Sequence, residues 1–122
     1  MPMTKAKQRD RLERRAGLLR ALAHPSRLLI IELLEKGPRT VSELTAIVGA
    51  DKTTVSKHLT VLKKVGLVRD KKRGTWSDYE LVCTCVSHFI DCIESGMEEN
   101  PAAASRQTRI IALRSGKPRR MI

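Results

Sequence analysis

The sequence predicts an α+β, mostly helical fold: a winged helix-turn-helix with a two-stranded β-hairpin wing. Three observations lead to this prediction. Residues 40–66 carry the spacing of two short helices joined by a tight turn. Two strand-like segments around a glycine-containing turn follow directly, as a wing follows its helix pair. Further apolar helical patterns lie before and after this unit.

Two helices are expected ahead of the helix pair. Between residues 10 and 23, leucine and alanine recur at helical spacing, which predicts an amphipathic helix. His24 then precedes Pro25, which suits the first position of a helix, so we expect His24 to cap this helix. Residues 28–34 are apolar almost all round, as in a central buried helix. Gly37 with the following proline ends it.

The first helix of the pair has recognisable signals at both ends. Thr40 can cap its N-terminus, and Glu43, three residues on, can return the hydrogen bond as a capping box. Gly49 is expected to end the helix in the left-handed conformation that suits glycine. The predicted apolar stripe between these ends is Leu44, Ile47 and Val48.

The second helix of the pair is the more informative one. Asp51 is its expected N-cap and Gly66 follows its end. Val55, Leu59 and Leu62 fall on one face and are expected to be buried. The opposite face carries short polar residues and lysines, which can donate hydrogen bonds to phosphates or base edges, and the N-terminal residues of a recognition helix are those that touch bases. The alternative is a surface helix pair with a solvated basic face.

The wing and a last helix complete the predicted elements. Leu67–Lys71 and Trp76–Val82 are expected as strands around a turn at residues 72–75. The last helix is expected at about Cys85–Met97. Its apolar stripe is larger than a helix needs merely to cover a small core, and consists of Val86, Phe89, Ile90, Ile93 and Met97.

Composition indicates the kind of partner. The chain has 122 residues, a net charge of +11 and a pI near 10.2, which favour a polyanionic partner. Only 2% of the residues are aromatic, too few for a platform that stacks single-stranded bases, so duplex DNA fits better. No apolar run suits a membrane span or a signal peptide, and we expect a cytoplasmic protein with no membrane partner.

The expected DNA contacts lie on the second helix of the pair and at the tip of the wing. For His58 a packing or phosphate-contact role is favoured over a metal role, since a lone histidine on this helix lacks partner ligands for a metal. The predicted set is Lys52, Thr53, Thr54, Ser56, Lys57, His58, Lys72 and Arg73.

Over about residues 21–94 the chain resembles the ArsR/SmtB family of bacterial metal- and metalloid-responsive repressors. The most specific matching runs are LAHPSRL, TTVSKHLTVLKKVGLV and RGTWSDYEL. The resemblance implies a homodimer, paired through its first and last helices, that represses an operon until an ion or other signal binds. Its operator should be an imperfect palindrome in double-stranded DNA with half-sites about one helical turn apart.

Three segments are expected along the chain. Residues 1–8 form a flexible basic arm, and residues 9–98 form the winged-helix DNA-binding and dimerisation domain. Residues 99–122 form a basic tail that is expected to be mostly disordered and to add non-specific affinity for DNA.

All three cysteines, Cys83, Cys85 and Cys92, lie within ten residues of one another. Thiolates are soft ligands, and three of them without an obvious fourth ligand suit As(III) or Sb(III). If Cys85 and Cys92 share a helix, they lie about 10 Å apart along its axis. Either Cys83 and Cys85 therefore lie in a non-helical segment that folds back, or Cys92 comes from the partner protomer. The structural alternative is that these cysteines are small buried apolar residues at the dimer interface.

The signal that the cysteines sense stays open. We expect As(III), or a similar thiophilic ion, as the inducer and no organic cofactor. The family's enteric-type arsenic sensors place a cysteine cluster around the recognition helix, which has none here. This chain instead resembles family members whose cysteines lie at the start of the last helix. The alternatives are a thiol redox or persulfide response, a Cd, Pb or Zn response, and a constitutive nucleoid-type DNA binder. A cysteine-based enzyme is not expected, because no glycine adjoins a cysteine to form an oxyanion-binding loop.

Overall fold

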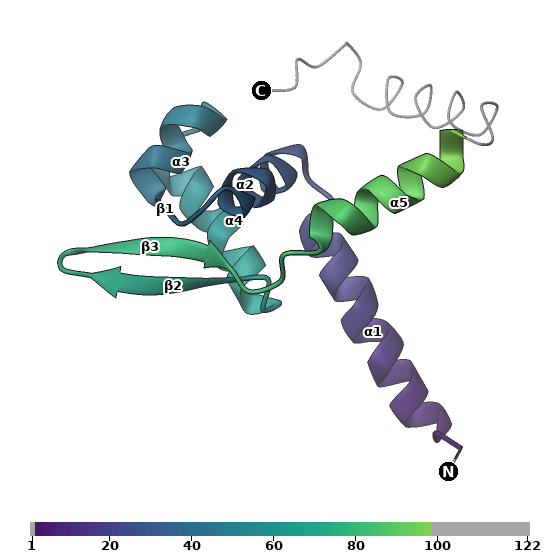
Figure 1. Ribbon diagram of the computed structural model, residues 1–122. Coiled ribbons are helices and arrows are strands. Elements are labelled where there is room, and N and C mark those ends of the chain that lie inside the picture. The colour runs from purple at the N-terminus through teal and green to yellow at the C-terminus, as the bar shows by residue number, and fades with distance from the viewer. Residues whose placement is uncertain (1, 99–122) are drawn as a thin grey trace. The chain divides into compact units, whose positions relative to one another are not determined.

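The structure is a computed structural model that describes residues 2–98 (Figure 1). The predicted tail, residues 99–122, lies outside the described residues. The described chain forms two compact units, one extending through Cys83 and the other beginning at Thr84. The element order confirms the predicted winged helix-turn-helix, and the elements are α1 (Lys5–Leu22), α2 (Pro25–Glu35), β1 (Arg39–Thr40), α3 (Val41–Val48), α4 (Lys52–Lys64), β2 (Val68–Arg73), β3 (Trp76–Leu81) and α5 (Val86–Glu98).

The core of the first unit is built around α2. Its Ile30 and Ile31 are fully buried, as its nearly continuous apolar sequence predicts. Helices α3 and α4 add their apolar faces, and β2 closes the core from the hairpin side. The fully buried side chains from these three elements are Leu44, Val55, Leu59, Leu62 and Val68.

The apolar stripe of α3 is buried only in part, because Ile47 lies outside the core. The side chain is 41% exposed, whereas Leu44 and Val48 of the same helix are buried. Helix α3 has only eight residues and packs along a single line joining Leu44 to Val48. Ile47 lies about 100° around the helix from Val48, so it falls outside that line.

Helix α1 begins earlier than the apolar spacing indicates. It starts at Lys5, where Thr4 caps it by accepting a hydrogen bond from the Lys7 amide at 3.3 Å. Residues 5–8 are therefore helical and not part of a flexible arm. Because these residues are polar, they carry no periodic apolar signal that could mark the start. Leu12 and Leu19, on the predicted apolar face, are half exposed within this unit.

The sheet has three antiparallel strands in the order β1-β3-β2. The short strand β1 was not predicted, because two residues carry no alternation; it pairs with Tyr79 and Asp78 of β3. The hairpin turn is also tighter than expected. Lys72 and Arg73 belong to β2, and only Gly74 and the next residue form the turn. Gly74 has a φ of 65°, which glycine adopts without strain.

The second unit contains α5, in good agreement with the helix predicted at about residues 85–97. Its first turn is closed by the Phe89 amide, which donates to the Cys85 carbonyl at 2.9 Å. Phe89 and Ile93, four residues apart, are 47% and 50% exposed. None of the helices within residues 2–98 is long and apolar enough to cross a membrane.

Candidate nucleic-acid interface and cysteine segment

Helix α4 is fixed at its start by Asp51, as its sequence predicts. One carboxylate oxygen, Oδ1, accepts a hydrogen bond from the Thr54 amide at 2.7 Å. The hydrogen bonds from Thr54 lower the pKa of Asp51, so the carboxylate is charged at neutral pH. On the core side, Val55, Leu59 and Leu62 hold the helix against the rest of the unit. The α3–α4 turn uses Gly49, whose φ of 77° is left-handed as expected.

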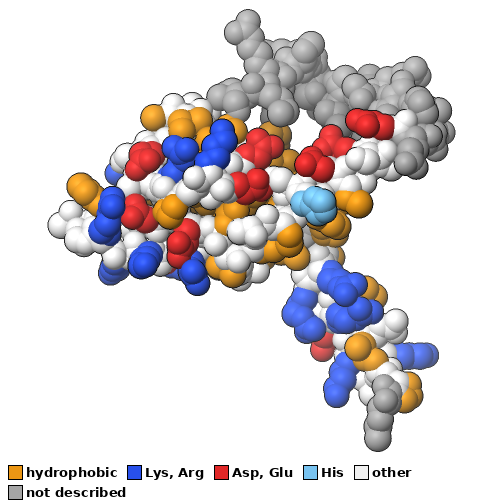
Figure 2. Space-filling view, viewed as in Figure 1, with side chains coloured by type: hydrophobic (Ala, Val, Ile, Leu, Met, Phe, Trp, Pro, Cys, Tyr) orange, Lys and Arg blue, Asp and Glu red, His pale blue; other side chains and the backbone are white. Residues whose placement is uncertain are grey.

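The outer side of α4 is polar over its first two turns. Lys52, Thr53, Thr54 and Lys57 are exposed and Ser56 is half-buried, so five of the predicted contact residues lie on an accessible helix start. Figure 2 shows further Lys and Arg side chains over the hairpin and along α1. This arrangement supplies hydrogen-bond donors and positive charge, the chemistry that phosphates and base edges require.

His58 lies apart from this polar face. Its Nδ1 accepts a hydrogen bond from Arg27 Nε of α2 at 3.2 Å, and its ring lies 4.5 Å from that of His24, centroid to centroid. Burial, and then the neighbouring His24 and Arg27, lower the pKa of His58. Of the two roles expected for His58, packing and phosphate contact, the geometry supports packing. His24 caps α2 as predicted, accepting from the Ser26 amide at 3.1 Å.

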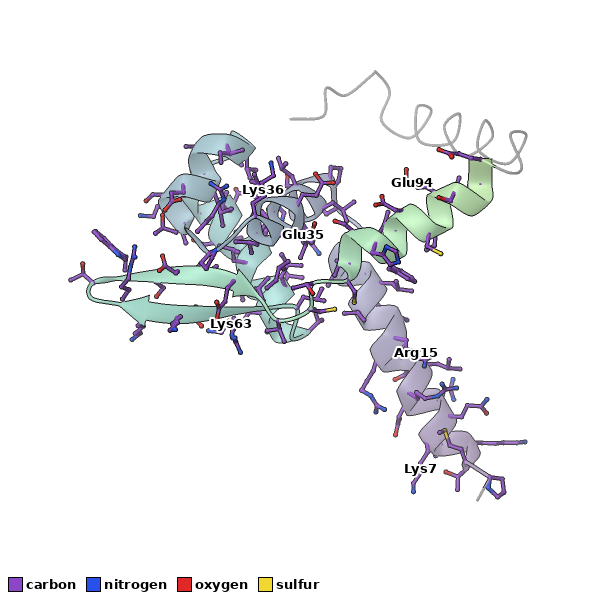
Figure 3. The ribbon with its side chains drawn as sticks, viewed as in Figure 1. Lys7, Arg15, Glu35, Lys36, Lys63 and Glu94 are labelled. Atoms are coloured by element: carbon purple, nitrogen blue, oxygen red, sulfur yellow. The ribbon has the colours of Figure 1, made fainter. Side chains whose placement is uncertain are left out.

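The hairpin is joined to the end of α4 by an ion pair. Lys63 Nζ lies 2.6 Å from an Asp70 carboxylate oxygen of β2, and this pairing raises the pKa of Lys63 and lowers that of Asp70 (Figure 3). The sequence had suggested Lys63 as part of the outer polar face. It instead forms an ion pair between α4 and the wing. The signal in the sequence is Asp70, the one acidic residue among the basic residues of β2.

Both predicted wing residues lie at the end of β2 beside the turn. Lys72 pairs in register with Ser77, and Arg73 pairs with Trp76. Both side chains are exposed. Arg73 Nε also lies 3.3 Å from an Asp78 carboxylate oxygen, which orients its guanidinium along the hairpin.

The cysteines occupy the segment that leads into α5 and the helix itself. Cys83, which is half-buried, ends the first unit, and the exposed Cys85 lies in the second, just before α5. Cys92 is exposed within α5. Residues 82–85 are not helical, as one of the two sequence interpretations requires. Within the described part of a single chain, no three His, Cys, Asp or Glu side chains gather as a metal-binding group.

Comparisons with known proteins agree with this architecture. Residues 24–70 match the family described as bacterial regulatory protein, arsR family. An uncharacterised HTH-type transcriptional regulator of Methanocaldococcus jannaschii is 34% identical over 86 residues, which cover 70% of this chain and 97% of that protein.

Two solved structures are also similar. One is a homodimeric winged helix-turn-helix DNA-binding domain from Mycobacterium bovis, a possible ArsR-family regulator. Its TM-score is 0.68 at 29% identity, covering 82% of this chain and 93% of the other. The second, described as a possible transcriptional regulator for arsenical resistance, has a TM-score of 0.55 at 32% identity, covering 65% of this chain and 82% of the other. On its helix-turn-helix, its wing and these matches, the chain belongs to the ArsR family of bacterial DNA-binding transcription regulators.

Proposed function

We propose that this protein is a homodimeric repressor that releases its operator when a thiophilic metalloid, As(III) foremost, binds the thiols of Cys83, Cys85 and Cys92. The observation that carries the DNA-binding part is the accessible polar start of α4 beside a basic hairpin. Such a regulator acts on DNA in the cytoplasm.

Each protomer places the start of α4 in a major groove. The proposed contacts on the helix are Lys52, Thr53, Thr54, Ser56 and Lys57, while Lys72 and Arg73 of the wing contact the backbone or the minor groove. The bound DNA is double-stranded, and two-fold symmetry of the dimer gives an imperfect palindrome with half-sites about one helical turn apart.

The dimer is proposed to form through α1 and α5. Each helix, considered within its own unit, exposes an apolar pair: Leu12 and Leu19 on α1, and Phe89 and Ile93 on α5. Apolar stripes of this kind are normally covered by a partner surface. The similar domain from Mycobacterium bovis is described as homodimeric, in keeping with this proposal.

The inducer site is proposed to need both protomers. Cys83 and Cys85 lie two residues apart in a non-helical segment, which allows both sulfurs to approach one ion. Cys92 lies about two helical turns beyond Cys85, too far along α5 to join them in the same chain. The partner's α5 could supply the third thiolate, and trigonal sulfur coordination suits As(III). Binding would then change the distance between the two recognition helices, a coupling of about 1–3 kcal/mol.

Fluorescence anisotropy on the protein's own upstream DNA tests this proposal. We expect arsenite and antimonite to release the labelled duplex, and zinc and cadmium to act more weakly. Each single change, Cys83→Ser, Cys85→Ser or Cys92→Ser, should abolish release while leaving DNA binding intact. The matched control is Thr84→Ser, which alters the same segment but no thiol and should respond like the unchanged protein.

A thiol redox or persulfide switch is the second candidate. It is favoured by the absence of a three-ligand group within the described part of one chain, because a disulfide or persulfide needs only two sulfurs. Operator release by an oxidant or persulfide, reversed by dithiothreitol and unaffected by a chelator, would identify it. If the protein binds its DNA tightly and specifically and no ion or oxidant releases it, both proposed inducers are overturned and the DNA-binding role stands.

A further inference from the structure

Trp76 is the most exposed large apolar residue in the described part of the chain. Its exposed fraction is 60%, and it is the single tryptophan of the sequence. Tryptophan is highly buried on average in folded proteins and is enriched at binding surfaces, because its ring is apolar and its N–H can donate a hydrogen bond.

The residue lies at the tip of the wing. Trp76 is the first residue of β3, directly after the turn, and it pairs in register with Arg73. Because side chains alternate across a sheet, Trp76 shares one face of the hairpin with Arg73 and Lys71, while Lys72 belongs to the other face. The indole therefore shares its face with two basic side chains, and a third lies on the opposite face of the tip.

The acidic residues on the face of Trp76 are engaged by arginines. Asp78 pairs with Arg73 at 3.3 Å, and Glu80 pairs with Arg69 at 2.7 Å. These pairs neutralise the two carboxylates, and Lys71 leaves this face of the hairpin with a net positive charge. A polyanion can thus approach the indole without meeting uncompensated negative charge.

We propose that Trp76 enters the DNA minor groove beside each half-site; this inference rests on the proposed function. Apolar side chains commonly wedge into the minor groove, and the indole N–H can donate to the adenine N3 and thymine O2 acceptors found there. The hairpin follows α4 closely in the chain, and Lys63 at the end of α4 pairs with Asp70 of β2. The tryptophan therefore reaches the groove next to the one that α4 occupies, and A·T base pairs should be favoured at this position.

Tryptophan fluorescence tests the inference directly, because Trp76 is the chain's only tryptophan. Titration with a duplex of the protein's own upstream DNA should change the indole emission and protect it from acrylamide quenching. In anisotropy measurements Trp76→Ala should weaken binding about tenfold, and Trp76→Phe should retain most of the affinity. Replacing A·T by G·C pairs at the flanks should weaken binding by the unchanged protein but not by Trp76→Ala. Val82→Ala is the matched control, since it trims a side chain of similar exposure (53%) at the opposite end of the hairpin.

The outcomes separate this inference from the proposed function. If anisotropy shows specific binding while the indole emission is unchanged and Trp76→Ala binds like the unchanged protein, the minor-groove contact is overturned and the repressor proposal stands. If Trp76→Ala changes the association state measured by sedimentation, the indole covers a second copy of this chain, which also overturns it. Absence of any duplex binding would remove both proposals.

Discussion

At the scale of single residues, Arg27 connects three helices through one guanidinium. It donates to the Ala21 carbonyl at the end of α1 at 3.0 Å and to His58 Nδ1 of α4 at 3.2 Å. A ring nitrogen can accept a hydrogen bond only when it is unprotonated, so the second contact requires His58 Nδ1 to carry no proton. Burial, and then the neighbouring His24 and Arg27, lower the pKa of His58, which favours the neutral ring that this contact needs.

This contact predicts a loss of stability in acid. Because the folded pKa of His58 is depressed, the unfolded chain binds more protons than the folded chain once the pH falls below about 6.5. The free energy of unfolding should therefore decrease as the pH is lowered through this value and level off below the folded pKa. Urea unfolding at several pH values between about 7 and about 5 measures this decrease in the free energy of unfolding. His58→Gln should reduce the pH dependence, whereas His88→Gln, at an exposed position on α5, should retain it. An equal pH dependence in both variants would contradict the role assigned to His58.

The packing of His58 could have been recognised more firmly from the sequence. His58 lies three residues after Val55 and four before Leu62, which is the spacing of the buried face of α4. Its partner Arg27 lies 31 residues away, and no local pattern indicates so distant a pairing. The residue's position on the helix was therefore predictable, whereas its contact depended on how α2 packs against α4.

At the scale of elements, the helix ends follow from local sequence. At the start of α3 the Thr40 hydroxyl accepts from the Glu43 amide at 3.2 Å, and the Thr40 amide donates to the Glu43 carboxylate at 3.5 Å. The capping box was predicted because all its parts lie within four residues. Strand β1 was not predicted, since its pairing with β3 exists only once residues 39 and 79 meet in the fold.

A pair of threonine variants tests the cap. Thr40→Ala removes the acceptor for the Glu43 amide and should lower the free energy of unfolding by about 1 kcal/mol. Thr45→Ala is the matched control within the same helix. The Thr45 hydroxyl donates to the Val41 carbonyl at 2.7 Å, a back-bond that adds little to a helix, so this change should be close to neutral. Urea unfolding of the two variants gives the comparison, and equal losses would show that the cap is not what stabilises α3.

At the scale of the whole molecule, the exposed apolar side chains are distributed unevenly over the elements. The start of α4 is polar and the hairpin tip is basic apart from Trp76, whereas α1 and α5 each expose an apolar pair within their own unit. The sequence predicted the polar start of α4 and the apolar stripe of α5, because each follows from periodicity within a single helix. It could not choose between a fold-back of the segment that carries Cys83 and Cys85 and a thiol supplied by a second chain. Cys85 precedes α5 and Cys92 lies within it, and neither the path of a loop nor the position of a partner follows from local spacing.

The apolar stripe of α5 leads to the prediction for the assembly. Burying one isoleucine contributes about 1.5–3 kcal/mol, and about 1.4 kcal/mol corresponds to a tenfold change in a dissociation constant. Ile93→Glu removes that burial and places a charge in the proposed interface. We therefore expect it to raise the dimer dissociation constant at least tenfold in sedimentation equilibrium. Operator affinity should fall with it, because a monomer reads only one half-site.

Ser95→Glu is the matched control for this test. It adds the same charge to α5, but its position lies about 160° around the helix from Ile93, measured the shorter way. The dimer and its operator affinity should persist in this variant. If Ile93→Glu stayed dimeric, the exposed stripe would belong to some other contact. If both variants dissociated, added negative charge on α5 would explain the loss, and the apolar stripe would not. The stripe lies between the two protomers only if the Ile93→Glu variant dissociates while the Ser95→Glu variant stays dimeric.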